Sequence, residues 1–164
     1  LLAYGSSGGE AEVILTAADI TATTLTVTVG SGGAAGTYDD TTASYAQSGT
    51  STTITIGATL IATAFPGTAT ATAVGASATI TQNAGTATIS GSYQGYTFGG
   101  RAGSGPQSTL VKNGLGAGLS TIGAVGQYGS GGTQTPITSP SFTGEWNVLA
   151  GGDGVALIEM YYYS

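Results

Sequence analysis

Carboxylates are the side chains of this chain to weigh first for acid–base or metal chemistry. The 164 residues include no His and no Cys, which excludes Ser-His-Asp and Cys-His catalysis and the usual imidazole or thiolate metal sites. Asp39 and Asp40 are adjacent in a turn-like context that fits an Asx turn or a weak Ca²⁺ site. Few other carboxylates lie nearby in the sequence, so we favour the plain turn and expect neither a cofactor nor enzymatic activity.

Aromatic side chains on glycine-rich segments are the candidate recognition residues. Tyr93, Tyr96, Phe98 and Arg101 are interspersed with glycines, and Tyr128 lies in a second glycine-rich stretch. Exposed aromatics on such loops offer a large contact area at little entropic cost, which is typical of a receptor-facing surface. The alternative is that these rings fill the core of a β domain that is short of aliphatic residues, and we favour that alternative because buried aromatics contribute strongly to a core.

The elements that must position these residues are predicted to be strands. Residues 25–29 alternate apolar with Thr, which is typical of a half-buried strand. Gly57 predicts a bulge or tight bend between two strands. Asp153-Gly154 predicts a hairpin turn near the end of the chain. Strands are expected at 13–15, 25–29, 52–56, 59–64, 68–74, 77–81, 86–90, 146–149 and 155–163, with a hairpin-like turn at 82–85.

Two features within this pattern have more than one interpretation. The Thr/Ala alternation of residues 68–74 gives a shallow face, which suits either a solvated meander or a closely packed interface. Glu159, on an otherwise apolar strand face, is either a charge that blocks edge-to-edge pairing or a partner for Arg101 or Lys112.

The composition limits the fold classes and the kinds of partner to be expected for this chain. The chain holds 30 glycines, only 6% charged residues and a net charge of −6. With two cations it cannot neutralise a run of phosphates, so we expect no nucleic-acid binding. Its apolar runs are too short to span a bilayer, so we expect no membrane insertion. The small supply of large aliphatic residues predicts a thin core and therefore an oligomer or packed assembly. We expect one all-β domain over 1–164, a glycine-rich β-sandwich-like or short-strand meander with long glycine loops and little or no helix; its parts are 1–67, 68–143 and 144–164.

The two ends of the chain resemble the glycine-rich domain of tailed-bacteriophage tail fibre and minor tail proteins. The resemblance rests on E-A-E-V-I-L-T-A-A-D-I at 10–20, on L-T-V-T-V-G-S-G-G-A-A-G at 25–36 and on G-G-D-G-V-A-L-I-E-M-Y at 151–161. The 30–36 segment lacks the Lys-Ser/Thr of a phosphate-binding loop. The resemblance covers 4–67 and 144–163, whereas the Thr/Ala-rich centre departs from the family.

This resemblance implies a structural virion protein in a tail fibre, spike or baseplate appendage. It further implies a trimer that contacts other virion proteins and can attach to a host polysaccharide or outer-membrane receptor. Three alternatives stay open: a capsid decoration or head-fibre protein, a bacterial extracellular fibre subunit that polymerises through strand edges, and a polysaccharide-degrading enzyme.

Overall fold

The structure is a computed structural model of the chain. It describes residue 6 and residues 8–34, 36–38, 43–44, 47–74, 77–100, 146–148 and 151–161. Within these residues every regular element is a strand and every strand pair is antiparallel, so the all-β prediction is confirmed. None of the described residues forms a helix long and apolar enough to cross a membrane.

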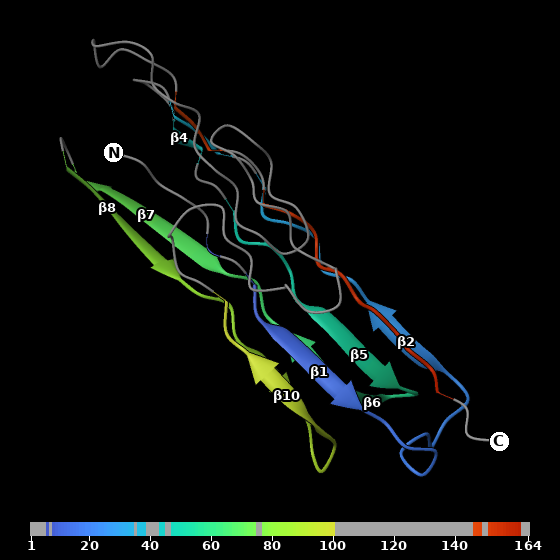
Figure 1. The fold of residues 1–164 in the computed structure, drawn as a ribbon. Coiled ribbons are helices and arrows are strands. Elements are labelled where there is room, and N and C mark those ends of the chain that lie inside the picture. Colours follow the sequence, from blue (N-terminus) through green and yellow to red (C-terminus); the bar gives the residue numbers. More distant parts are fainter. Residues whose placement is uncertain are drawn as a thin grey trace.

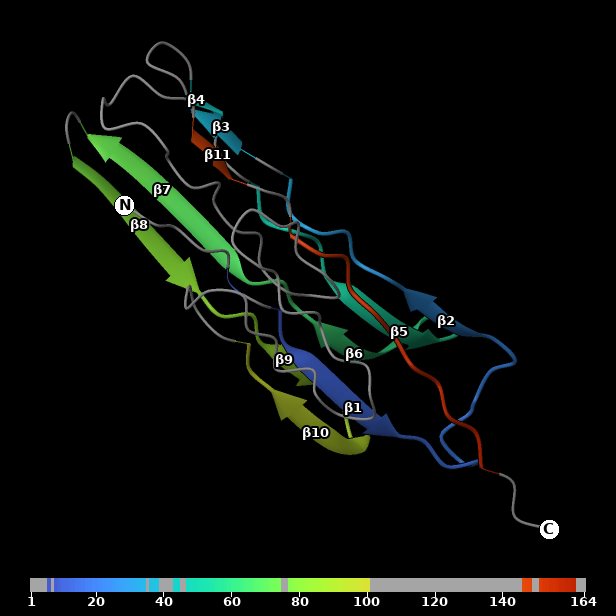
Figure 2. The same cartoon turned by 45° about the horizontal axis from the view of Figure 1, so that its top comes forward.

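The strands run along one common direction, which makes the described part of the molecule elongated (Figures 1 and 2). Four hydrogen-bonded groups are present: β1-β10, β11-β3-β4, β2-β5-β6-β9 and β7-β8. The strands are β1 (Glu10–Ile14), β2 (Leu25–Thr28), β3 (Gly36–Tyr38), β4 (Ala43–Ser44), β5 (Thr52–Ile56), β6 (Thr59–Ala64), β7 (Thr68–Val74), β8 (Ser77–Asn83), β9 (Ala87–Ile89), β10 (Gln94–Phe98) and β11 (Trp146–Val148).

One long antiparallel ribbon joins β2 and β3 to β4 and β5. Leu25 pairs with Ile56 at one end and Tyr38 pairs with Ala43 at the other. Between these strand pairs the amide of Thr50 donates to the carbonyl of Ser31, which keeps the same register. The segment expected as a glycine loop is therefore the middle of an extended ribbon.

A second ribbon has β6 and β7 on one side and β8 and β9 on the other. Ala64 pairs with Ala87 and β7 pairs with β8 over its whole length, again in one register. The predicted hairpin with its turn at 82–85 is wrong, because β8 pairs with β7 and β9 pairs with β6. The β6-β9 pair ends at Ala64 and the β7-β8 pair begins at Thr68. Pro66 lies between them, and it has no N–H to donate to a β ladder.

The connection between β5 and β6 was predicted to the residue. Ile56 pairs with Thr59, which leaves a two-residue loop that begins with Gly57 at a φ of 57°, a backbone conformation that glycine adopts without steric cost. The register of the pair shifts between Ile54 and Thr55, so that Ile61 is the extra residue on β6. The bulge lies here rather than at Gly57.

The core is small and centred on this bulge. Ile61 is fully buried, and Ile56 and Ala62 are 2% and 3% exposed. Consecutive residues on a regular strand face opposite sides, so the bulge helps to explain how Ile61, Ala62 and Thr63 are all buried. Among the residues whose burial is described, these two isoleucines are the buried large apolar side chains, which agrees with the thin core expected from composition.

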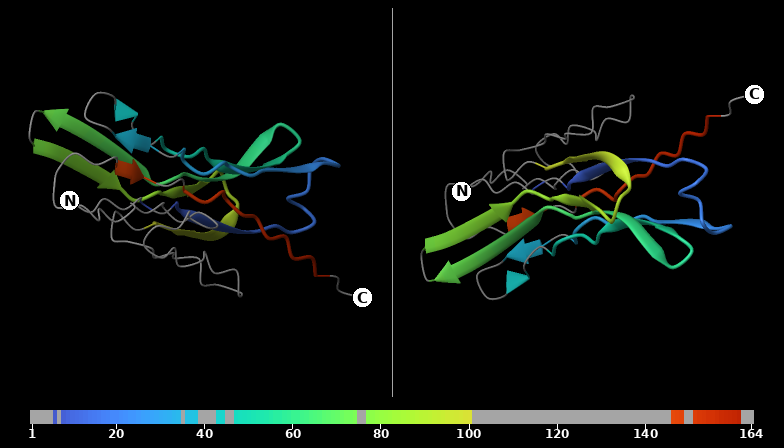
Figure 3. Two further views of the ribbon diagram at one scale, coloured as in Figure 1. Left: turned by 90° about the horizontal axis from the view of Figure 1, so that it is seen from above. Right: turned by 90° about the horizontal axis from the view of Figure 1, so that it is seen from below.

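The β1-β10 pair forms a second layer, and β1 contacts both β6 and β9 (Figure 3). The lead-in to β1 is attached to the second ribbon, where the amide of Gly9 donates to the carbonyl of Phe65. The predicted strands at 13–15 and 25–29 are both present in shifted form, and they pair with β10 and β5.

The predicted C-terminal hairpin is wrong. Trp146 to Val148 do form a strand, but its partner is β3, and residues 151–161 contain no strand. Asp153-Gly154 does not reverse the chain, because this segment pairs with residues far away in the sequence. The amide of Gly151 donates to the carbonyl of Gly33, and the amide of Gly154 donates to the carbonyl of Gly30. This pairing continues the register of β11 with β3. Residues 162–163 of the expected strand lie outside the described part.

Candidate functional site

The glycine segments from the two ends of the chain meet at one place, which we call the glycine junction: residues 30–33, 47–52 and 151–154. The amide of Gly32 donates to Oδ1 of Asp153 over 2.7 Å. On the opposite side, the amide of Gly30 donates to Oγ1 of Thr52 over 3.0 Å, and the amide of Ser31 donates to Oγ1 of Thr50 over 2.8 Å. Side-chain oxygens thus replace carbonyl partners for three successive amides.

Close approach of the backbones explains why this junction needs glycine. A Cβ on Gly30 would overlap the carbonyl of Thr50, and a Cβ on Gly32 would overlap the carbonyl of Gly151. Neither glycine has a positive φ, so the absence of a side chain is the requirement, rather than unusual backbone conformation. The junction has the chemistry of a structural clamp that fixes the C-terminal segment to the first ribbon.

A second candidate surface is the outer face of the β1-β10 pair. Glu10 pairs with Phe98 and Glu12 pairs with Tyr96; directly opposed residues of an antiparallel pair project on the same side. Two carboxylates and two aromatic rings therefore share one face, which we call the aromatic face. The opposite side of the β1-β10 pair includes Gly95. A Cβ at this position would meet the Cδ1 of Ile89, so this side faces β9.

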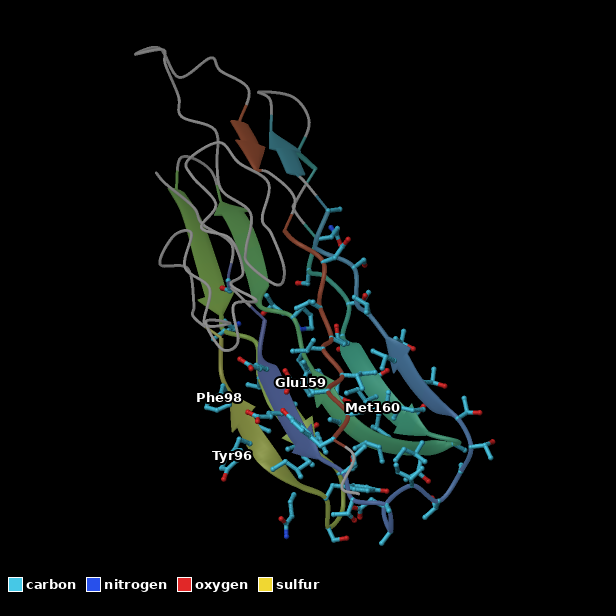
Figure 4. The ribbon with its side chains drawn as sticks, turned by 45° about the vertical axis from the view of Figure 1, so that its right-hand side comes forward. Tyr96, Phe98, Glu159 and Met160 are labelled. Atoms are coloured by element: carbon cyan, nitrogen blue, oxygen red, sulfur yellow. The ribbon has the colours of Figure 1, made fainter. Side chains whose placement is uncertain are left out.

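Exposure confirms which side faces outward. Tyr96 is 62% exposed and Phe98 is 42% exposed, and both side chains point away from the body of the molecule in Figure 4. The interpretation that the aromatics fill the core is therefore wrong for these two residues, because β10 pairs with β1 in a register that turns them outward. Tyr93 precedes β10 and is half-buried.

The aromatic face can bind without doing covalent chemistry. Aromatic rings offer flat apolar surfaces for stacking, and carboxylate oxygens accept hydrogen bonds. Glu10 and Glu12 were not singled out in the sequence; the signal was their two-residue spacing, which places both on one side of a strand. Their association with Tyr96 and Phe98 depends on a pairing across more than eighty positions of sequence, which no local pattern reveals.

Several predicted site residues lie outside the described part of the chain: Arg101, Tyr128, Asp39 and Asp40. The weak Ca²⁺ candidate is therefore still a prediction, and so is a receptor-facing role for all five predicted residues, of which Tyr93, Tyr96 and Phe98 lie in the described part. Within the described ranges no group of three or more Asp, Glu, His or Cys residues could hold a metal ion.

Two further carboxylates have clear local roles. The hydroxyl and the amide of Thr16 donate to Oδ2 of Asp19 over 2.6 and 2.8 Å, and these hydrogen bonds, the hydroxyl first, lower the pKa of Asp19 below 3.8. Glu159 is exposed and accepts a hydrogen bond from the hydroxyl of Tyr161 over 2.7 Å. Its predicted partners Arg101 and Lys112 lie outside the described residues.

Comparison with known proteins gives no family. No family model, curated protein or solved structure gives a significant match to this chain. The class of the protein is accordingly defined by its own geometry: an elongated antiparallel β protein with a glycine junction, a small core and an exposed aromatic face.

Proposed function

We propose that this chain is a structural virion protein of a tailed bacteriophage, a part of a tail fibre, spike or baseplate appendage, that works as a homo-oligomer. The observation that carries the proposal is the glycine junction, where hydrogen bonds join residues 30–33 to residues 151–154. Both stretches belong to the segments that resemble the phage glycine-rich domain. Two segments that form one motif in a family are expected to contact each other in the fold.

The shape and the burial of the chain support an assembled state. Twelve large apolar side chains are at least 39% exposed, whereas two, Ile56 and Ile61, are buried among the described residues. Extended strands along one axis suit a fibrous part (Figure 2). A chain with so small a core gains stability from neighbours, and the family resemblance favours three copies.

Quantitative mass spectrometry of purified particles tests this function. We expect peptides of this chain in the particles at a few copies per tail. Tens to hundreds of copies per particle would instead indicate a head decoration or head fibre, and absence from all particles would overturn the proposal.

Host attachment through the aromatic face is the second part of the proposal. A carbohydrate of the host surface is a suitable ligand class, since the rings of Tyr96 and Phe98 can stack on sugar faces while Glu10 and Glu12 accept hydroxyl hydrogen bonds. We expect the Tyr96→Ala variant to compete less well than the wild-type protein for phage adsorption. Phe65→Ala, at a 39% exposed ring between β6 and β7 and outside the aromatic face, is the comparison variant. Equal competition by Tyr96→Ala and the wild type would contradict the assignment.

A bacterial extracellular fibre subunit is the second candidate function. The observation in its favour is the edge of β2, which has one hydrogen-bonded neighbour, β5, among the described strands. The position of the gene separates the two functions: a place among head and tail genes supports the virion protein, and a place far from them supports the fibre subunit.

A further inference from the structure

The C-terminal segment carries apolar side chains that are more than half exposed. Leu157 and Ile158 are 53% and 52% exposed, and Met160 and Tyr161 are 73% and 76% exposed. Exposed runs of apolar residues are unfavourable on a soluble surface unless they serve a contact. Glu159 and Met160 are labelled on this segment in Figure 4.

The strand beside this segment is also incompletely covered. The pairing of the C-terminal segment with the first ribbon ends at the bond from the amide of Gly154 to the carbonyl of Gly30. Beyond that bond the same register would bring the segment alongside β2, but no backbone hydrogen bond joins β2 to residues 155–159. Leu25 and Val29 are 42% and 50% exposed there, and the edge has neither Lys nor Pro to discourage pairing.

We propose that a second copy of this chain covers the apolar flank, which we define as residues 25–29 and 155–161. The inference rests on the proposed function in one respect, namely that the protein works as an assembly of identical copies. It adds the surface through which the copies meet.

Charge favours this flank over the acidic surfaces of the chain as the place where two copies meet. The chain carries eight acidic and two basic residues, so two copies repel wherever their acids face each other. The apolar flank holds a single charge, Glu159, whose carboxylate already accepts the hydroxyl of Tyr161. A basic partner would instead be attracted to surfaces with more carboxylates, such as the aromatic face with Glu10 and Glu12.

The pairing already present in the chain indicates how the contact is made. The flank continues directly from the glycine junction, where strand-like backbone from the C-terminus adds to the edge of the first ribbon. Addition of an extended segment to an open sheet edge is a common mode of association. Contact between flanks therefore extends a pairing that begins within one chain.

Matched isoleucines allow a sharp test in the full-length protein. Ile158 on the flank is 52% exposed and Ile20, in the turn region before β2, is 58% exposed. We expect Ile158→Asp to raise the concentration at which copies associate by at least about 10-fold in sedimentation measurements, which corresponds to about 1.4 kcal/mol. Ile20→Asp is expected to associate like the wild type.

A labelling experiment avoids dependence on a disruptive variant. The chain has no cysteine, so Ile158→Cys and Ile20→Cys each introduce a unique thiol. In the assembled protein we expect maleimide to react several-fold more slowly with the thiol at 158 than with that at 20, and equally fast with both after dilution to single copies. Equal rates in the assembly would overturn the flank as the interface, whereas a wild-type protein that stays monomeric at all concentrations would overturn the homo-oligomer itself.

These outcomes are distinct from failure of the virion function. If Ile158→Asp does not affect assembly, the apolar flank is not the interface, but the virion proposal is not contradicted. If the protein is absent from phage particles, the virion function is refuted. The sedimentation and labelling results still show whether the apolar flank is the interface.

Discussion

The carboxylate of Asp153 accepts a hydrogen bond from the amide of Gly32 over 2.7 Å, across 121 positions of sequence. This contact joins the end of the chain to the first ribbon at the glycine junction. It also shows why an Asp-Gly pair need not form a turn: the side chain that would stabilise a local reversal is bonded instead to the distant segment between β2 and β3.

Removal of this carboxylate is expected to loosen the junction. We predict that Asp153→Ala lowers the free energy of unfolding by about 1 kcal/mol, since Asp153 is exposed and the hydrogen bond competes with water. Asp153→Asn keeps an acceptor oxygen and should lose less. Urea unfolding measures both variants, and hydrogen exchange at the Gly32 amide should accelerate in Asp153→Ala; an unchanged exchange rate would argue against the bond.

A side chain added at a glycine of the junction should lower the free energy of unfolding more than removal of the Asp153 carboxylate does. We predict that Gly32→Ala destabilises the protein by about 1–3 kcal/mol, because its Cβ would overlap the carbonyl of Gly151. Gly99→Ala is the control, since the nearest atom to its Cβ would be 3.8 Å away and its φ is not positive. Thermal unfolding compares the two, and equal midpoints would show that the segments do not approach closely at Gly32.

The prediction from sequence succeeded where the determining interactions are local. Strands β5 and β6 and the tight connection at Gly57 were predicted to the residue, since alternation and a single glycine define them. The C-terminal hairpin and the hairpin at 82–85 were wrong because each depended on a local turn signal, whereas the real partners are β3 and β7. The core interpretation of Tyr96 and Phe98 failed for a related reason: the register with β1 decides which side of β10 faces solvent.

Ile61 is expected to be the most sensitive apolar position of the described core. We predict that Ile61→Ala costs about 2–5 kcal/mol, since the side chain is fully buried beside the bulge. Ile61→Val should cost about 0.5–1.5 kcal/mol, in proportion to the single methyl group removed. Denaturant unfolding measures these changes, with Ile20→Ala, at a 58% exposed side chain, expected to stay within about 0.5 kcal/mol of the wild type. A loss for Ile61→Ala no larger than for Ile20→Ala would refute this core.

The turn at Thr16 and Asp19 should respond to acid. Two hydrogen bonds from Thr16 lower the pKa of Asp19 below 3.8 in the folded chain. The ionised form is favoured by folding, so its contribution is fully present above 3.8 and is lost as the pH falls through the lower, folded pKa. NMR titration of the Asp19 carboxyl should give a midpoint below 3.8, which Thr16→Val shifts upward and Thr23→Val leaves unchanged; a wild-type midpoint at or above 3.8 would contradict the two bonds.

The assignment to a phage tail is tested most directly by imaging. Purified phage particles would be labelled with a gold-conjugated antibody raised against this chain and examined by electron microscopy. The account predicts gold at the distal parts of the tail, on fibres, spikes or the baseplate. Gold spread over the head shell, or particles without gold beside a labelled extracellular fibre, would contradict it.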